Sequence, residues 1–276
     1  MSFTKFNKTT VTIVFVGDIM LHPDQLEYEM EHNWEFEGIF DEIKPIFKKA
    51  DAVIGNLETT FSDFKKLPEH RQWTFIAPDE FASALKKAGF THLTLCNNHM
   101  FDGEYFGFER TQQLIRNNKM LPIVNQTYFP VKGQTVEVLN FTTHLNPSGV
   151  PSHERTKYQN YDFLSVKESD IKIAFPHWGG QYNPEPDGEQ LKLANYLTKK
   201  NYDVIGAGPH SYHDTIKDDK LIAYSLGDFL SAHQKPGTTN EGKILSVTFD
   251  NGEIKSYKEY KIKTVTTNGK SVIKLI

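Results

Sequence analysis

A chain of 276 residues with 38% hydrophobic and 24% charged side chains has the composition of a globular protein that can bury one large core. Its formal net charge of −4 provides no basic field for a polyanion, so we expect no nucleic-acid partner. No apolar run approaches the roughly 20 residues of a membrane span, and the apolar run 11–16 is too short for a signal peptide. We therefore expect a cytoplasmic chain, or an extracytoplasmic one if a leader has been removed.

Six short apolar runs predict buried strands. They span residues 11–16, 52–57, 92–96, 171–175, 204–205 and 221–226. Stretches with helical periodicity separate them, and this alternation is typical of an α/β fold. We therefore predict a single α/β domain over residues 1–276.

Four segments between these runs carry helical signals. They are residues 36–49, 78–88, 108–118 and 187–200. The first has one apolar stripe, with Pro45 as an expected kink. The second begins at Pro78 and stops at Gly89, and the fourth begins with the capping-box pair Asp187 and Gln190.

Three further segments have different patterns. Residues 136–143 predict a strand, and residues 146–160 predict a long polar loop of the kind that often serves as a lid. From residue 244 to 276, alternating residues around the turn Asn251-Gly252 predict a β-hairpin and edge strands. The single cysteine, Cys96, ends an apolar run, so we expect a buried packing residue rather than a nucleophile.

Every predicted strand ends in a segment of glycine and polar residues. Because open α/β sheets place their sites at the carboxyl ends of strands, we expect these segments to converge. Taken singly, each has an ordinary explanation as a turn, a helix cap or a histidine at the core edge. The segments are Gly17-Asp18, Gly55-Asn56-Leu57-Glu58, Asn97-Asn98-His99, Pro176-His177-Trp178-Gly179, Gly206-Ala207-Gly208-Pro209-His210 and Gly227-Asp228.

The residue types in these segments suit a metal centre. Imidazoles, carboxylates and an amide oxygen are ligands of Zn²⁺, Mn²⁺ or Fe²⁺, whereas an all-oxygen set would suit Mg²⁺ or Ca²⁺. Such an ion lowers the pKa of bound water towards about 7. His99 is a candidate for proton transfer, because a carboxylate at Asp102 can orient its ring if the turn is helical. The alternative is a polar loop cluster that makes only local backbone bonds.

Several stretches resemble the CapA, or poly-γ-glutamate capsule synthesis, family, a branch of the calcineurin-like metallophosphatase superfamily. They occur in the family's order and extend from residue 11 to about residue 230. They are GDIML at 17–21, GNLE at 55–58, NNHMFDGEYFG at 97–107, HWGGQYNPEPDGEQ at 177–190, GPH at 208–210 and YSLGDF at 224–229.

The resemblance implies a four-layer fold, in which helices flank a two-sheet sandwich, with one or two ions of Mn, Zn or Fe at the strand ends. It assigns metal-side roles to Asp18, Glu58, Asn98, His177 and His210. It places His99 as the general acid, with Asp102 beside it as the second catalytic candidate. Candidates for substrate contact are Asn56, Trp178, Gln181, Tyr182 and Asp228, and the aromatic residues Trp34 and Trp73 are further candidates for a substrate groove.

The chain departs from the family pattern at four places. Gln181 stands where the family has Glu, and Pro23 replaces a common Arg. The segment 206–210 replaces GHHPH, so at least one imidazole is missing. Asp228 replaces an Asn and could compensate for that loss, with His213 or His22 as further candidates. The DxH and GDxxD motifs of the superfamily are absent from the sequence. The sequence is therefore equally consistent with one bound ion and with two.

Three functions remain open from the sequence. The first is a metal-dependent hydrolase acting on a phosphoester or a glutamyl-type amide, with a small-molecule, peptide or polyglutamate-type substrate. The second is a peptide epimerase on the same fold. The third is a non-catalytic member that serves as a binding or scaffold subunit for a capsule polymer. The sequence does not predict an oligomeric state.

Overall fold

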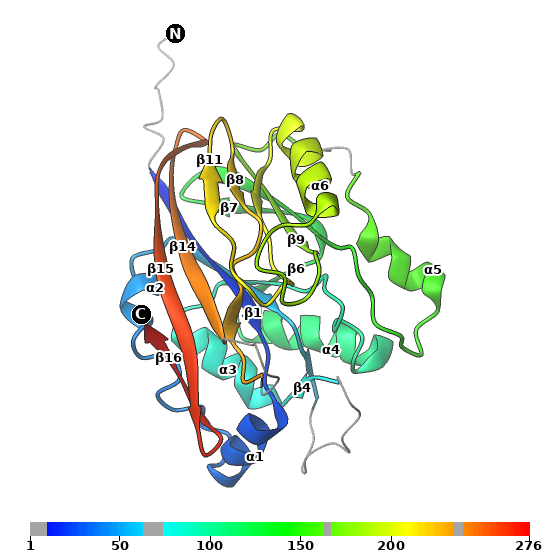
Figure 1. Ribbon diagram of the computed structural model, residues 1–276. Helices are drawn as coiled ribbons and strands as arrows, with labels where there is room; N and C mark the ends of the chain where they lie inside the picture. The colour runs from blue at the N-terminus through cyan, green and yellow to red at the C-terminus, as the bar shows by residue number, and fades with distance from the viewer. Residues whose placement is uncertain (1–9, 63–73, 163–166, 234–239) are drawn as a thin grey trace.

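Two β-sheets lie face to face between layers of helices in the computed structural model, which describes residues 10–62, 74–162, 167–233 and 240–276 (Figure 1). This is the two-sheet α/β sandwich with flanking helices that the resemblance implies. The first sheet joins strands from the two ends of the chain, whereas the second is built from the consecutive strands β7 to β12.

The first sheet has eight strands in the order β16-β15-β14-β1-β2-β5-β6, and β13 pairs with β1 beyond this path. Strands β1, β2, β5 and β6 are parallel, whereas β14, β15 and β16 form an antiparallel extension. The bounds are β1 Val11–Ile19, β2 Ala52–Leu57, β5 His92–Thr94, β6 Leu121–Ile123, β13 Asp228–Leu230, β14 Glu241–Asp250, β15 Glu253–Thr267 and β16 Lys270–Leu275. Asn251 and Gly252, both at positive φ, form the turn between β14 and β15.

The second sheet has six strands in the order β11-β12-β10-β9-β8-β7. Strands β8, β9, β10 and β12 are parallel, and the edge strands β7 and β11 are antiparallel to their neighbours. The bounds are β7 Asn125–Val131, β8 Gln134–Thr142, β9 Ile171–His177, β10 Asp203–Ile205, β11 Thr215–Lys217 and β12 Leu221–Ala223. A separate pair joins β3 (Thr60–Phe61) to β4 (Ile76–Ala77).

Helices cover both outer faces of the sandwich (Figure 1). Their bounds are α1 Pro23–Glu31, α2 Lys44–Phe47, α3 Asp79–Ala88, α4 Glu104–Asn117, α5 Ser152–Arg155, a 3₁₀ turn at Thr156–Gln159, and α6 Gly188–Lys199. Helices α1 to α4 pack on the first sheet, and α6 packs on the second. No helix in the described part of the chain is long and apolar enough to cross a membrane.

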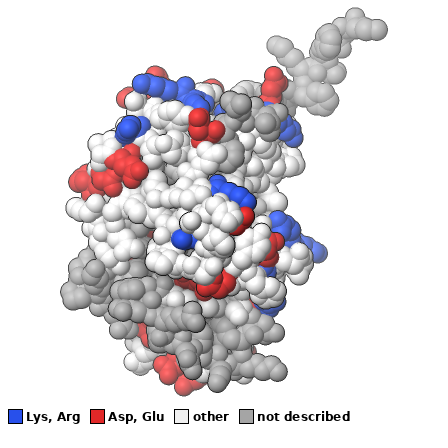
Figure 2. All heavy atoms as spheres, turned by 90° about the vertical axis from the view of Figure 1, so that its right-hand side faces the viewer, with Lys and Arg blue, Asp and Glu red and all other residues white. Residues whose placement is uncertain are grey.

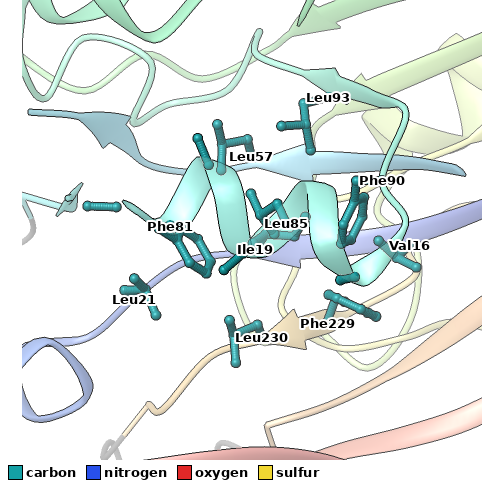
Figure 3. Close-up of a cluster of buried hydrophobic side chains, with 14 of the residues drawn as sticks. Val16, Ile19, Leu21, Leu57, Phe81, Leu85, Phe90, Leu93, Phe229 and Leu230 are labelled. Carbon is teal, nitrogen blue, oxygen red and sulfur yellow. The ribbon is translucent and has the colours of Figure 1, made fainter. Parts of the chain in front are cut away.

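Alternation along β1 divides its side chains between two cores. Val11, Ile13 and Phe15 enter the core between the sheets, where they meet side chains of β8 and β9. Val14 and Val16 point to the opposite face and belong to the core beneath α3, which Figure 3 shows with Phe81 and Leu85 of that helix. Because β1 is buried on both faces, it reads as a continuous apolar run in the sequence.

Several predicted helices are confirmed. Helix α3 follows Pro78 and ends at Gly89, which has a φ of 114°. Helix α6 has the predicted capping box, in which Asp187 accepts from the backbone N–H of Glu189 and Gln190. Helix α4 begins at Glu104, four residues before the predicted start.

The prediction of one helix over residues 36–49 is wrong. Only Lys44–Phe47 is helical, and Pro45 lies in its first turn, where a missing N–H costs nothing, instead of kinking a longer helix. Phe36 and Gly38 have positive φ values, so the chain cannot be helical there. The long polar loop predicted at 146–160 is also only partly a loop, because α5 and the 3₁₀ turn occupy residues 152–159. Strands β6 and β7 and helix α1 were not predicted.

The surface in Figure 2 carries charges of both signs. Lys and Arg are interspersed with Asp and Glu on this face, and the described atoms in that view form no continuous basic field. The only cysteine, Cys96, is buried, and burial raises the pKa of its thiol to about 12, in agreement with the predicted packing role.

Candidate metal centre and active site

Polar side chains from both sheets meet at the carboxyl ends of the strands. Asp18 lies near the end of β1 and Glu58 directly follows β2. His177 ends β9 of the second sheet, and His210 follows β10. The parallel pairing of β1 with β13 places Asp228 in register with Asp18. The convergence predicted from the six strand ends is therefore present.

A glycine permits the close approach of β1 and β13. The Asp18 N–H donates to Gly227 O at 3.0 Å, and a Cβ on Gly17 would lie 1.9 Å from this oxygen. No side chain larger than hydrogen fits in that space. Gly17 therefore allows the register that brings the two aspartates together.

We expect Gly17→Ala to destabilise the fold by about 1–3 kcal/mol, because the backbone of β1 or β13 has to move to admit the methyl group. Urea denaturation followed by circular dichroism measures this change. Gly188→Ala at the start of α6 is the matched control, since no heavy atom lies within 4 Å of its added Cβ and Ala favours a helix over Gly. A Gly17→Ala variant as stable as the wild type would contradict the steric argument.

Asp18, Glu58 and His210 form the first candidate cation group, because their ligand atoms all lie within 4.8 Å of one another and all three side chains are buried. Both carboxylate oxygens of Asp18 accept hydrogen bonds. Its Oδ1 accepts from Asn56 Nδ2 at 2.8 Å, and its Oδ2 accepts from Gly208 N at 3.1 Å and lies 3.2 Å from His210 Nδ1. Asn56 thus orients a carboxylate and is not directed at a substrate.

Glu58, His177 and Asn98 leave buried polar atoms without hydrogen bonds. Glu58 Oε1 lies 3.2 Å from His177 Nε2. Among the described residues, no hydrogen-bond partner is found for the two carboxylate oxygens of Glu58, the two ring nitrogens of His177 or the Oδ1 of Asn98. Buried polar atoms are almost always paired, and a set of carboxylate, imidazole and amide acceptors matches the ligands of a divalent transition metal. The residues present therefore fit such an ion.

The charges in this group depend on one another. Burial lowers the pKa of His210, but the charges of Glu58 and Asp228 and the hydrogen bonds of Asp18 and Asp228 raise it well above its usual value. Burial raises the pKa of Asp18, and the hydrogen bond and charge of His210 outweigh it, so the net pKa is lowered. Burial raises the pKa of Asp228 to about 6. These carboxylates require positive charge, which a proton on His210 or a divalent cation supplies.

His99 and Asp102 form a separate pair beside the cation group. His99 Nδ1 lies 2.7 Å from Asp102 Oδ2, and the same oxygen accepts from Phe75 N at 2.6 Å. The two residues lie three apart in a turn, as predicted for an orienting carboxylate, and not in a helix. Phe75 also packs edge-on against the His99 ring, with centroids 4.7 Å apart. With Nδ1–H donating to Asp102, Nε2 is the atom available for proton transfer, and Asn146 Nδ2 lies 3.4 Å from it.

A histidine that no sequence pattern indicated lies beside Asp228. His233 Nε2 is 3.7 Å from Asp228 Oδ2, and its ring centroid is 4.7 Å from that of His210. His233 follows β13 in an irregular segment, so neither strand nor helix periodicity pointed to it. The only signal was its position five residues after Asp228, on the chain leaving the site.

His22 and His213, the two further candidates for the centre, both lie outside the first cation group. The His22 ring lies 4.6 Å from that of His233, and its Nε2 is 3.1 Å from Ser231 Oγ, so it borders the site without joining the first group. His213 Nε2 contacts Asn183 O at 3.0 Å and lies outside the Asp18–Glu58–His210 group. Burial lowers the pKa of His22 to about 3 and that of His233 to about 2, which favours neutral imidazoles.

The substrate candidates also need one correction. Trp178 is 1% exposed, donates from Nε1 to Tyr224 O at 2.8 Å, and packs in the core beneath α6, so it does not line a groove. Tyr182 is half-buried, and its ring centroid lies 5.6 Å from that of His210. Gln181 is exposed next to it. Trp34 packs against the core beneath α3, and Trp73 lies outside the described residues.

Comparisons with known proteins agree with this geometry. Residues 12–233 match the family model described as "Bacterial capsule synthesis protein PGA_cap". The chain is 27% identical over 271 residues to "Capsule biosynthesis protein CapA" of Bacillus anthracis, covering 88% of this chain and 65% of the relative. It is 26% identical over 248 residues to "PGA biosynthesis protein CapA" of Bacillus subtilis (strain 168), covering 82% and 64%. The chain thus spans slightly less than two thirds of each relative.

Solved structures show the same fold at low identity. A hypothetical protein from Thermus thermophilus has a TM-score of 0.54 at 16% identity, covering 91% of this chain and 98% of that chain. A novel phosphatase from Mycoplasma pneumoniae has a TM-score of 0.56 at 14% identity, covering 92% and 94%. At such identities the likeness concerns the fold alone, and the expected two-sheet α/β sandwich flanked by helices is confirmed.

Proposed function

The chain belongs to the family of bacterial capsule synthesis proteins described as PGA_cap, and on that premise we propose that it is a metal-dependent hydrolase acting on a capsule-type polymer. The observation that carries the proposal is the set of buried ligand atoms of Glu58, His177 and Asn98 that have no hydrogen-bond partner among the described residues, beside the Asp18–Glu58–His210 group. Leaving such groups buried is costly unless a cation or a substrate completes them. A purely structural role for the family fold would not require this arrangement.

The residues divide into two tasks. Asp18, Glu58 and His210 would hold a divalent ion such as Mn²⁺, Zn²⁺ or Fe²⁺, with Asn98 and His177 as further ligands. When bound, the ion supplies Lewis acidity towards a phosphoryl or carbonyl oxygen and towards water. Asn56 and Gly208 N hold the Asp18 carboxylate in position through the hydrogen bonds described above.

His99 supplies the proton. Asp102 fixes its ring through Nδ1, and Phe75 N–H fixes Asp102, so Nε2 is presented in a defined direction. We assign to Nε2 the donation of a proton to the leaving group, an alkoxide of a phosphoester or the amine of a glutamyl amide. Asp102 acts through His99, by orienting the ring and stabilising its charged form.

The names of the relatives support the proposed substrate class. Their printed names refer to capsule biosynthesis and to PGA biosynthesis, which supports a polyglutamate-type polymer. The phosphatase among the similar structures supports only the fold, so a phosphoester remains the alternative bond.

The test uses metal-free protein reconstituted with Mn²⁺, Zn²⁺ or Fe²⁺. Release of nitrophenolate from p-nitrophenyl phosphate reports phosphoester cleavage, and size-exclusion chromatography of poly-γ-glutamate reports amide cleavage. We expect metal-dependent turnover of one substrate that Glu58→Gln abolishes. Protein that binds metal but cleaves neither would contradict the hydrolase. Deuterium uptake from the solvent by the polymer without cleavage would identify an epimerase.

A further inference from the structure

The segment 143–160, which follows β8 and includes α5, folds back onto the turn that carries His99. The backbone N–H of Asn146 donates to Asn98 O at 3.4 Å, and its side-chain Nδ2 lies 3.4 Å from both ring nitrogens of His99. We propose that Asn146 contacts the substrate, and that its carboxamide binds the leaving-group atom that receives the proton of His99. Arg155 is the positioning residue that holds Asn146 there. The proposal rests on the hydrolase function above and adds these two residues to its site.

The distance between Asn146 and His99 allows one substrate atom to contact both side chains. His99 Nδ1 faces Asp102, so Nε2 is the ring nitrogen that faces a substrate. An atom that forms a hydrogen bond of about 2.9 Å with Nε2 can lie at about the same distance from Asn146 Nδ2, because the two nitrogens are only 3.4 Å apart. The two side chains therefore converge on a single atom.

The carboxamide of Asn146 suits both bonds that the proposed function considers. It carries a donor at Nδ2 and an acceptor at Oδ1, and rotation about the Cβ–Cγ bond exchanges their places. When a P–O bond breaks, the departing oxygen keeps the electron pair and takes the proton from His99 Nε2, while Nδ2 donates to the same oxygen. When a C–N bond breaks, the departing nitrogen takes the pair and the proton, while Oδ1 accepts from its N–H. Asn146 itself transfers no proton.

The side chain of Asn146 contributes little to the fold. Among the described residues, its contacts are the two with the His99 ring. Their length of 3.4 Å exceeds the usual range of about 2.7–3.2 Å for a hydrogen bond from N–H. Asn140, by contrast, donates to Phe175 O at 2.8 Å and accepts from the backbone N–H of Cys96 at 2.8 Å, as a structural asparagine does. The half-buried carboxamide of Asn146 is therefore available to a substrate.

Arg155 holds the turn that presents Asn146. Its Nη1 donates to Asn146 O at 3.0 Å, and its Nε donates to Val150 O at 2.9 Å, so the guanidinium joins the two ends of this turn. Val150 is itself buried in the core. These attachments fix Asn146 relative to His99 before a substrate arrives, which is the arrangement that lowers the entropic cost of reaction.

Rates on substrates with good and poor leaving groups test the contact. The metal-loaded protein is assayed on p-nitrophenyl phosphate against phenyl phosphate, and on γ-glutamyl-p-nitroanilide against poly-γ-glutamate. For the poorer leaving group of the class that is cleaved, we expect Asn146→Ala to lower kcat/KM about 10- to 100-fold, the usual value of a hydrogen bond to a charged group. For the nitrophenyl substrate, the loss should stay below about threefold, because a weakly basic leaving group needs little stabilisation.

Control variants separate this contact from a structural effect. Asn160→Ala removes an exposed carboxamide of the same segment, and Lys157→Ala removes an exposed cation that pairs with Glu154, so both should leave the rates unchanged. Arg155→Ala should give the same dependence on the leaving group as Asn146→Ala. The double variant should be no slower than Asn146→Ala, because both residues act through one contact.

The outcomes distinguish this proposal from the hydrolase itself. An equal loss on both leaving groups, or no loss on either, would overturn the contact and leave the hydrolase standing. If only the polymer is cleaved, a loss on it below about threefold would overturn the contact as well. Wild-type protein that binds metal but cleaves none of these substrates would contradict both. Asn146→Leu, which is similar in size and forms no hydrogen bond, replaces the alanine variant if that variant does not fold. Circular dichroism and metal content, both expected at wild-type values, check each preparation.

Discussion

Replacing His99 by alanine is expected to lower turnover about 10²- to 10⁴-fold, the usual contribution of a positioned general acid. The bound metal should be unchanged, because His99 is not part of the Asp18–Glu58–His210 group. The measurement is kcat on the substrate identified in the reconstitution assay, together with the metal content of the same preparation.

Two matched variants show whether the effect is chemical. His92→Ala removes a partly buried imidazole far from the site and should leave kcat unchanged. Asp102→Asn keeps the size of the side chain but weakens the orientation of His99, so it should lower kcat and shift the pH profile of the reaction. Full activity of metal-loaded His99→Ala would remove this residue from the mechanism.

Replacing His210 by alanine is expected to destabilise the metal-free protein by about 3–5 kcal/mol, the cost of removing one partner from a buried ion pair. His210 Nδ1 lies 3.2 Å from Asp18 Oδ2 and 3.0 Å from Asp228 Oδ1, and all three side chains are buried. The variant leaves two carboxylates buried without a cationic partner. Urea denaturation in the presence of a chelator measures the free energy of unfolding.

A second substitution separates lost charge pairing from lost packing. Adding Asp228→Asn to His210→Ala should recover part of the stability, because a neutral amide does not need the imidazolium. If the double variant were no more stable than His210→Ala, the effect would come from the cavity alone. A loss below about 1 kcal/mol in the single variant would show that the pairs contribute little, as exposed pairs do.

The positions of the strand ends can be predicted because the signal lies in a short stretch of sequence. An apolar run followed by glycine and a polar residue indicates where a buried strand leaves the sheet, and parallel strands leave at one edge. That reasoning predicts that Asp18, Glu58, His177 and His210 converge, and the structure places them at that edge. His233 had no such signal, because it lies in an irregular segment whose path is set by tertiary contacts.

Trp178 shows the limit of reasoning from adjacency. It follows His177 directly, yet successive side chains at the end of a strand point to opposite sides. His177 points towards Glu58, and Trp178 points into the core beneath α6. The wrong prediction of a helix at 36–49 has a similar origin. An apolar stripe indicates which residues are buried but does not determine the backbone conformation.

The most direct test of the account is a crystal grown with Mn²⁺ and measured at a wavelength where manganese scatters anomalously. We expect an anomalous peak about 2.0–2.3 Å from ligand atoms of Asp18, Glu58 and His210. Crystals soaked with chelator should lose the peak. A fully ordered site with no anomalous peak near these three residues, at saturating Mn²⁺, would contradict the metal centre on which the proposed chemistry depends.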